Sequence, residues 1–221
     1  MYGGVVIHTS SWGISFRTGK HKTGTRKRFW EAEFVGMKDG KEYKYNPNYD
    51  NSKSYVYGKL NYFYILRLGK GIQKIINHKP FWGGVEVRYV GFAGLSLGIT
   101  KPVYLYILNI SNNIYEGYTL TEEKYDPAKH DLDNIYGRAP FTKGLDQLHL
   151  YPGIYGKFGF NFEYGANDKF VKAIEVGAVV DSYFQNIPIM AYAKNKSYFV
   201  SLYFSVNFGG RYNRHEAKNK T

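Results

Sequence analysis

Charged side chains recur inside otherwise apolar, alternating segments of the sequence, and they are the residues best able to do chemistry. They are Arg17, Glu31, Glu33, Lys59, Arg67, Glu86, Arg88, Lys157, Glu163, Glu175 and Asp181. Each lies opposite the apolar side chains of its predicted strand, because side chains alternate between the two faces of a strand. These five cations and six carboxylates are close to electrical balance, and buried charges must pair. The pattern predicts a packed ionic network in the lumen of a closed sheet, in preference to an open channel or an active site.

A group of serine and histidine residues near the start of the chain is the candidate for covalent catalysis. His8, Ser10 and Ser11 lie close together in sequence, and His149 lies much further along. A serine becomes a nucleophile when a base activates it and a third group orients that base. Alternation places His8 and Ser10 on the apolar face of the first predicted strand, and no nucleophile motif surrounds them. We therefore expect no catalytic residue, and a lipid A-modifying enzyme of the deacylase or acyltransferase type stays as the alternative function.

The spacing of the remaining histidines does not indicate a metal site. They occur singly, at His21, His78, His130 and His215, without a second histidine or a carboxylate at ligand spacing. The full phosphate-loop pattern is also missing from the sequence. We expect no metal and no cofactor, and we expect these histidines to be solvated.

Residues 197–209, near the end of the chain, show what kind of element positions the charged side chains. Apolar residues such as Val200 and Leu202 alternate there with small polar residues such as Ser201 and Ser205. This alternation predicts a strand with one apolar face and one mixed face. Its length of about twelve residues is twice that of an ordinary strand and suits a tilted strand that crosses a bilayer.

Seven other segments are predicted as strands, six from the same alternation and one, residues 103–109, from a run that is nearly all apolar or aromatic. They are residues 5–17, 29–38, 55–68, 84–99, 103–109, 151–164 and 169–183. With the last strand they make eight, and bacterial outer-membrane barrels have an even number of strands. A barrel of eight strands is just wide enough for side chains to fill. The sequence therefore predicts an all-β fold, in which residues 1–221 form one eight-stranded antiparallel transmembrane outer-membrane β-barrel with a filled polar lumen.

The connections between these segments predict how the barrel is oriented. Residues 100–102 and 165–168 have the composition of tight turns, which we place on the periplasmic side together with the N-terminus. The long connections then face outside, beginning with the basic residues 20–28, and residues 39–54 are the exception. Since no signal peptide is visible, we expect the sequence to start at or near a mature end.

The composition fits a membrane barrel. Aromatic residues make up 19% of the chain, with 25 glycines and no cysteine, as expected for aromatic girdles and a strongly bent sheet. The mean hydropathy is −0.44, and no run approaches the roughly 18 apolar residues that a spanning helix needs. A soluble barrel is also disfavoured, because soluble proteins avoid apolar faces this long.

The basic residues predict the partners of the chain. The net charge of +12 is concentrated in residues 20–28 and in the tail, residues 210–221, with no nucleic-acid-binding motif beside them. Loops and tails of this kind bind anionic membrane surfaces. We therefore expect outer-membrane lipid and lipopolysaccharide as partners, and no nucleic acid.

Residues 110–149 form a far longer connection than two strands require, and long loops of this kind are usually functional. The apolar residues that mark this loop as a candidate for binding a partner are Tyr115, Tyr118, Tyr125, Leu132, Ile135, Tyr136, Phe141 and Leu145. A short helix is predicted at residues 126–131. Because aromatic residues are enriched in protein interfaces, the loop either docks a partner or caps its own barrel.

Several runs of the sequence resemble a small outer-membrane β-barrel family of Bacteroidota. They are residues 33–38, 83–89, 124–145, 157–164 and 187–192, and the similarity extends over almost the whole chain. The resemblance implies a location in the outer membrane and a role as an accessory barrel subunit of a larger assembly. The barrel-assembly machinery of Bacteroidota is the leading candidate, with a large barrel and surface lipoproteins as partners. The resemblance supplies no site residues.

Overall fold

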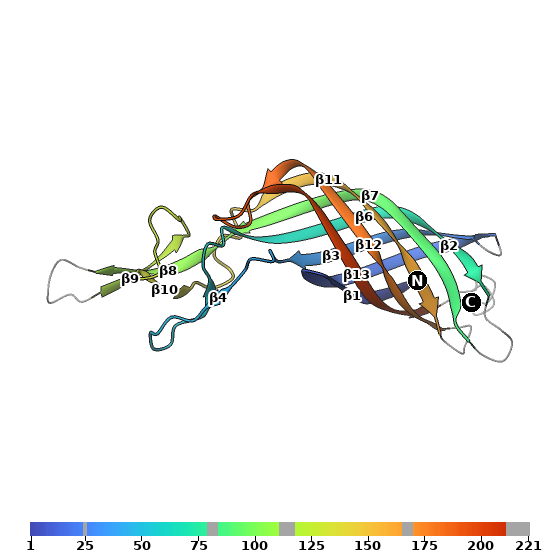
Figure 1. Ribbon diagram of the computed structural model, residues 1–221, viewed down its shortest axis with the longest axis horizontal. Helices are drawn as coiled ribbons and strands as arrows, with labels where there is room; N and C mark the ends of the chain where they lie inside the picture. The colour runs from blue at the N-terminus through green and yellow to red at the C-terminus, as the bar shows by residue number, and fades with distance from the viewer. Residues whose placement is uncertain (24–25, 79–83, 111–117, 165–169, 211–221) are drawn as a thin grey trace, which may run out of the picture.

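The computed structural model describes residues 1–23, 26–78, 84–110, 118–164 and 170–210. Within these residues the chain is built of β-strands (Figure 1). The described part of the chain holds no helix that is long and apolar enough to cross a membrane.

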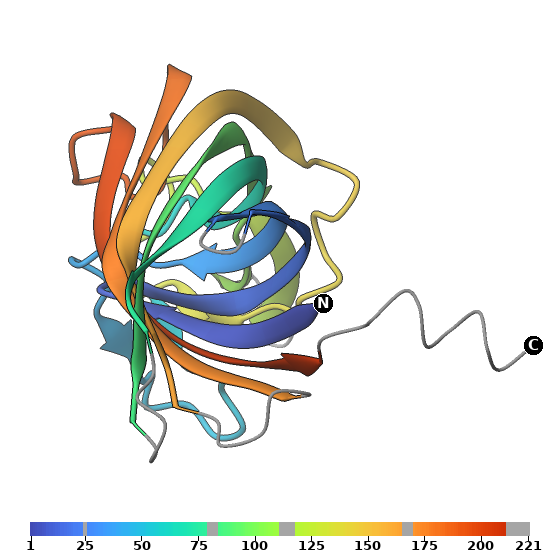
Figure 2. The ribbon, with the colours of Figure 1, turned by 90° about the vertical axis from the view of Figure 1, so that its right-hand side faces the viewer.

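Eight strands form one closed ring, which Figure 2 shows end-on. They are β1 Tyr2–His8, β2 Ser11–Thr23, β3 Arg26–Met37, β6 Asn61–Asn77, β7 Glu86–Pro102, β11 His149–Glu163, β12 Phe170–Ile187 and β13 Lys196–Gly210. Their order around the ring is β1-β13-β12-β11-β7-β6-β3-β2, and each neighbouring pair is antiparallel. The prediction of an all-β fold with eight antiparallel strands is confirmed.

The outside of the ring is apolar, and its inside holds buried charged and polar side chains together with apolar ones such as Ile65 and Val90. In β13, Val200 and Leu202 are 64% and 68% exposed on the outer face, whereas Ser201 and Ser205 are buried inside. The other strands follow the same rule, as the alternation predicts, because successive side chains of a strand point to opposite faces. The arrangement differs from that of a soluble protein, in which charged side chains are rarely fully buried and large apolar surfaces are rarely exposed.

The predicted number of strands is right, but two of the predicted segments are wrong, and a third, residues 55–68, starts too early because β6 begins at Asn61. Residues 5–17 are not one strand, because Thr9 and Ser10 turn the chain between β1 and β2 and leave His8 paired with Ser11. Residues 103–109 lie outside the ring, since β8 Tyr104–Ile110 belongs to a separate sheet. The first error counts two ring strands as one and the second adds a strand that is not in the ring, so the predicted total of eight is still right.

The expected tight turn at residues 100–102 is also wrong. Strand β7 continues through this segment, and its last residue, Pro102, pairs with Asn61 at the start of β6. A proline is tolerated there because it stands at the very end of the strand. The chain then passes through Val103 into β8 and leaves the ring.

The long connections all lie at one end of the ring, opposite the end where β1 begins and β13 ends (Figure 1). Residues 38–60 and 103–148 protrude there together, so residues 39–54 are not the exception that the sequence suggested. Residues 20–28, expected as a loop on that side, instead belong mainly to β2 and β3 and lie at the opposite end. The expected turn at residues 165–168 lies outside the described residues.

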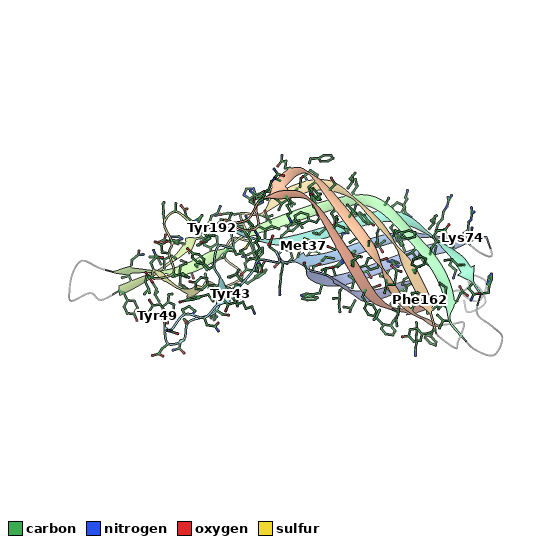
Figure 3. All side chains as sticks on the ribbon, in the orientation of Figure 1. Met37, Tyr43, Tyr49, Lys74, Phe162 and Tyr192 are labelled. Carbon is green, nitrogen blue, oxygen red and sulfur yellow. The ribbon has the colours of Figure 1, made fainter. Side chains whose placement is uncertain are left out.

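The protruding part, which we call the extension, is a folded unit with its own apolar core. It comprises β4 Lys44–Tyr45, β5 Tyr55–Val56, β8, β9 Tyr118–Lys124 and β10 Ile135–Arg138. The strands β10, β8 and β9 form one antiparallel sheet, and β4 pairs with β5. Its buried core consists of Tyr55, Val103, Leu105, Ile107, Tyr125 and Ile135. In Figure 3, Tyr43 and Tyr49 lie on the extension, whereas Lys74 and Phe162 mark the far end of the ring.

Candidate functional site

The charged side chains of the ring meet in its interior, and Arg17 on β2 makes the first of two clamps. Its guanidinium donates to Glu175 on β12 through Nη1 and Nη2, at 2.6 and 2.8 Å, and to Glu31 on β3 through Nε, at 2.5 Å. Paired, charge-assisted hydrogen bonds of this kind are the strong ones in proteins. All three side chains are buried, so this clamp ties β12 to β2 and β3 across the ring.

Arg67 on β6 makes the second clamp. Its Nε and Nη2 donate to the two carboxylate oxygens of Asp181 on β12, at 2.9 and 2.7 Å, and its Nη1 donates to Glu33 on β3. Ser96 on β7 also donates to Asp181, at 2.9 Å. The second clamp therefore holds β12 against β3, β6 and β7.

Lys157 on β11 connects the two clamps. Its Nζ lies 2.5 Å from Glu33 and 3.4 Å from Glu31, and it also lies 4.4 Å from the centre of the Tyr203 ring. The charged contacts are therefore continuous from Arg17 to Asp181. We call these residues the central network, and they are Arg17, Glu31, Glu33, Arg67, Lys157, Glu175 and Asp181.

His8 joins the central network, which the sequence did not predict. Its Nε2 lies 3.3 Å from Glu33 and 3.5 Å from Arg67, and its side chain is fully buried. The expectation that His8 lies on the apolar outer face is wrong, because the turn at Thr9 and Ser10 shifts the alternation by one residue. The central network itself has three cations and four carboxylates, and His8 lies beside the carboxylate of Glu33.

Two tyrosine hydroxyls donate hydrogen bonds to carboxylates of the central network, and each lies close to a glycine of another strand. Tyr203 donates to Glu175 at 2.8 Å, and Tyr155 donates to Glu31 at 3.3 Å. A Cβ atom at Gly159 would lie only 2.4 Å from the Tyr203 hydroxyl, and one at Gly69 only 2.5 Å from the Tyr155 hydroxyl. Glycine is therefore needed at these two positions for the close approach of the tyrosines.

Three other predicted residues form a second, smaller group inside the ring, towards the end where β1 begins. Arg88 on β7 contacts Glu86 at 2.5 Å and Glu163 on β11 at 2.6 Å. Lys27 on β3 is also buried on the inner face of this end. Lys27 is not among the residues predicted from the sequence, although its position four residues before Glu31 places it on the same face of the strand.

Lys59 is the predicted network residue that lies elsewhere. It precedes β6, at the extension end of the ring, and its Nζ pairs with Glu42 at 2.6 Å. Burial lowers the pKa of Lys59, although Glu42 opposes this effect. The expectation that Lys59 belongs to the interior network is wrong because residues 55–60 are not part of the long strand.

An apolar layer covers the central network at the extension end of the ring. Ile187, the last residue of β12, and Ile189 and Met190, which follow it, are buried in one cluster with Phe63 and other inward side chains of the ring. Backbone hydrogen bonds from residues 60 and 61 to the carbonyl of Ile189 hold this segment in place. Residues 187–190, and not the loop at residues 110–149, therefore provide the cover.

The eight loop residues predicted as a partner-binding group separate into different roles. Tyr125 and Ile135 are buried in the core of the extension. Tyr136 stacks on Tyr49 with ring centres 5.4 Å apart, and its hydroxyl donates to the carbonyl of Asp50 at 2.5 Å. The side chains exposed on the surface are Tyr118, Leu132, Phe141 and Leu145. Tyr115 lies outside the described residues.

The segment at residues 126–131 makes a single hydrogen-bonded turn and not the predicted helix. His130 closes this turn, because its Nδ1 accepts from the backbone N–H of Asp126 at 3.1 Å and its Nε2 lies 3.2 Å from Glu123. The side chain is buried, so the expectation that it is solvated is wrong. The hydrogen bonds of Glu123 to Thr121 and His130 lower the pKa of this carboxyl.

The structure does not assemble the serine and histidine residues near the start of the chain into a catalytic group. Ser10 lies in the turn, His8 points into the ring, and His149 is exposed at the start of β11. In the described part of the chain, no side-chain hydrogen bond joins Ser10 or Ser11 to either histidine. Those residues also include no group of three or more His, Asp or Glu side chains placed to hold a metal ion.

Comparisons of the chain with models of protein families, with curated proteins and with solved structures found no match.

Proposed function

We propose that the chain is a transmembrane β-barrel of the bacterial outer membrane. Its outer wall supports this proposal, because large apolar side chains are exposed on every strand of the ring. Leu95 on β7 is 69% exposed, Leu202 on β13 is 68% exposed, and Phe158 on β11 is 56% exposed. Soluble monomers rarely expose apolar patches of more than a few hundred Å², and here apolar side chains are exposed on all eight neighbouring strands. The hydrocarbon interior of a bilayer would remove these side chains from water.

The strand lengths and the two ends of the ring agree with this proposal. Most ring strands have 12 to 18 residues, more than the roughly 9–11 that a tilted strand needs to cross the bilayer. Outer-membrane barrels have short turns on the periplasmic side and long loops outside. We therefore assign the extension to the outside and the beginning of β1 to the periplasm.

Within the membrane we propose that the chain is a structural and binding subunit of a larger outer-membrane complex, with no chemistry of its own. The central network and its apolar cover fill the interior of the ring, which supports a plugged barrel over a pore. The observation that carries the binding role is the separate core of the extension, because it holds exposed side chains in fixed positions. Tyr43 is 79% exposed and Phe141 is 56% exposed on this surface.

The resemblance to small barrels of Bacteroidota gives the proposal its most specific form. In that form the chain is an accessory subunit of the machinery that assembles outer-membrane proteins, and the extension contacts a large barrel or a surface lipoprotein. Exposed aromatic residues such as Tyr43 are typical of the anchors at protein interfaces.

Purification from native outer membranes tests this proposal. A tagged chain extracted in mild detergent is expected to retain a large barrel or surface lipoproteins in fixed stoichiometry, identified by mass spectrometry. Tyr43→Ser, combined with Leu132→Ser, is expected to release the partner, whereas Lys194→Ser, an exposed change near β12 and β13, is the matched control.

Three results would contradict parts of the proposal. Recovery of the chain alone argues against a subunit, and altered lipid A in a deletion strain then supports the lipid-modifying alternative. Recovery in the soluble fraction contradicts the membrane location. Stepwise ion conductance of the purified chain in planar bilayers contradicts the plugged interior.

A further inference from the structure

A groove on the outer wall of the ring lies next to a small cationic cavity of the extension. The groove has a volume of about 700 Å³ and the cavity about 150 Å³. Tyr62, Arg138 and Phe141 line both of them, so the two spaces adjoin. An apolar surface that ends at a group of cations is the arrangement that an anionic lipid requires.

The lower part of the groove is apolar and belongs to the wall of the ring. Trp12 and Ile14 on β2 are 65% and 59% exposed there, and Phe34 on β3 is 44% exposed. The rings of Phe34 and Tyr64, which also line the groove, are stacked with centres 5.9 Å apart. A surface of this kind fits extended acyl chains, which pack by area and not by directed bonds.

The upper part of the groove is cationic. Lys38, Lys44, Lys59 and Arg138 line it together with one carboxylate, Glu42. Because Glu42 is paired with Lys59, the other cations are left to attract an anion from outside the chain.

The adjoining cavity is lined by three cations and by no carboxylate. They are Lys53, Lys101 and Arg138. None of the three forms an ion pair with a carboxylate in the residues that the structure describes, in contrast to Arg17 and Arg67 inside the ring. Three cations beside one cavity repel one another, and an anion between them removes this repulsion.

The backbone and the aromatic side chains hold these cations in place. The N–H of Arg138 donates to the carbonyl of Lys53 at 3.1 Å, which joins the two residues side by side. Lys101, at the end of β7, is only 2% exposed, and its Nζ lies 4.7 Å from the centre of the Phe141 ring and 5.3 Å from that of Tyr62. A buried ammonium held between two rings, without a carboxylate, is the polar part of a preformed site.

We propose that this groove and cavity bind a phosphorylated, acylated glycolipid of the lipid A type. A phosphate group occupies the cavity beside Lys101 and Arg138, and acyl chains lie along the wall over Trp12 and Phe34. The assignment rests on the proposed membrane location, because the extension end then lies at the outer leaflet, where this class of lipid is found. A phosphate suits the cavity because it accepts several charge-assisted hydrogen bonds at once.

Native mass spectrometry of the full chain in neutral detergent tests the site with three probes. They are purified lipid A, the same lipid A after hydrolysis of its phosphates, and phosphatidylglycerol. Lipid A is expected to bind in a one-to-one ratio, and the dephosphorylated lipid at least tenfold more weakly. Equal binding of the dephosphorylated form overturns the phosphate site, and equal binding of phosphatidylglycerol overturns the assignment to lipid A.

Charge-matched double variants show where the lipid binds. Lys53→Gln with Arg138→Gln is expected to weaken lipid A binding by about thirtyfold, because each basic residue near an anionic lipid contributes about a factor of five. Lys194→Gln with Lys196→Gln removes two exposed cations at the same end of the ring and is expected to change binding less than twofold. An equal loss in both variants overturns the proposal, because it indicates attraction to net charge alone.

The same samples separate this proposal from the membrane location on which it rests. Both double variants change exposed residues in the extension or at the extension end of the ring, so both are expected to fractionate with the outer membrane as the unmodified chain does. A chain found in the soluble fraction overturns the proposed function. A chain found in the membrane that binds no lipid A in detergent overturns this site alone.

Discussion

Replacement of Arg67 by methionine tests whether the central network is held by specific pairs. Arg67 makes two hydrogen bonds to Asp181 and one to Glu33, and all three side chains are buried. In Arg67→Met, Asp181 keeps Ser96 as a hydrogen-bond donor but has no cation, while Glu33 keeps Lys157. Removing one partner of a buried ion pair costs about 3–5 kcal/mol, because the other charge is left uncompensated. We expect a loss of stability of that size.

The double variant Arg67→Met with Asp181→Leu is the matched control. It removes the unpaired carboxylate together with the guanidinium, and Ser96 keeps a hydrogen bond with the Tyr183 hydroxyl at 3.0 Å. Replacing a whole buried pair with apolar side chains is often neutral. We therefore expect the double variant to be more stable than Arg67→Met by about 2 kcal/mol or more, although it carries one more substitution.

Urea titration of the unmodified chain, Arg67→Met, Asp181→Leu and the double variant, each reconstituted in lipid vesicles, measures these differences. Folding is followed by tryptophan fluorescence and by the mobility of unheated samples in detergent gels. A loss below about 1 kcal/mol for Arg67→Met shows that water solvates Asp181, which contradicts a filled interior. A double variant no more stable than the single one shows that the arginine acts by its volume and not by its charge.

Three further predictions concern the glycines, the tyrosines and the extension. Gly159→Ala is expected to lose about 1–3 kcal/mol of stability in urea unfolding, because the added methyl group overpacks the interior. Gly156→Ala is the control and is expected to be neutral, since a Cβ there meets no atom within 4 Å. Equal effects of the two variants contradict the close approach of the Tyr203 hydroxyl to Gly159. Tyr203→Phe is expected to cost about 1.5–3 kcal/mol in the same measurement, because Glu175 loses a hydrogen bond, and an unchanged midpoint argues against that bond. Ile135→Ala is expected to lower the stability of the extension alone by about 2–5 kcal/mol, because it leaves a cavity in the core of the extension. Limited proteolysis should then cut the extension while the ring stays resistant. Cleavage of both parts indicates that they unfold as one cooperative unit.

The sequence predicts which side chains point into the ring, because successive side chains of a strand alternate between its two faces. Within a long strand, the position of one inward residue fixes all the others, so Glu31 and Glu33 predict Val35 as surely as they predict each other. The apolar outer wall makes this rule easy to detect in β13. For this reason the structure places all but one of the predicted charged residues inside the ring.

The errors arose where the sequence did not clearly mark a break in the alternation. The hairpin at Thr9 and Ser10 shifts the alternation by one residue between β1 and β2. The prediction carried the phase of β2 back over β1, because no glycine or asparagine marks the turn. His8 was assigned to the wrong face for this reason. Residues 103–109 are apolar on both faces, which suits β8, where one face packs on the core of the extension, as well as it suits a ring strand. Which cation meets which carboxylate depends on the register between strands, and a single sequence does not give it.

The pairing of β1 with β13 has a consequence for the way each molecule is made. Tyr2 pairs with Gly209, so the ring has its seam between the strand that is synthesised first and the strand that is synthesised last. Until β13 arrives, β1 and β12 both present unpaired edges, and each edge is a template for a strand of another chain. Contacts so distant along the chain also form slowly. The open sheet, before β1 and β13 pair, is therefore the state in which this protein is most prone to pair with another chain. A factor that prevents such pairing has to cover two strand edges at once.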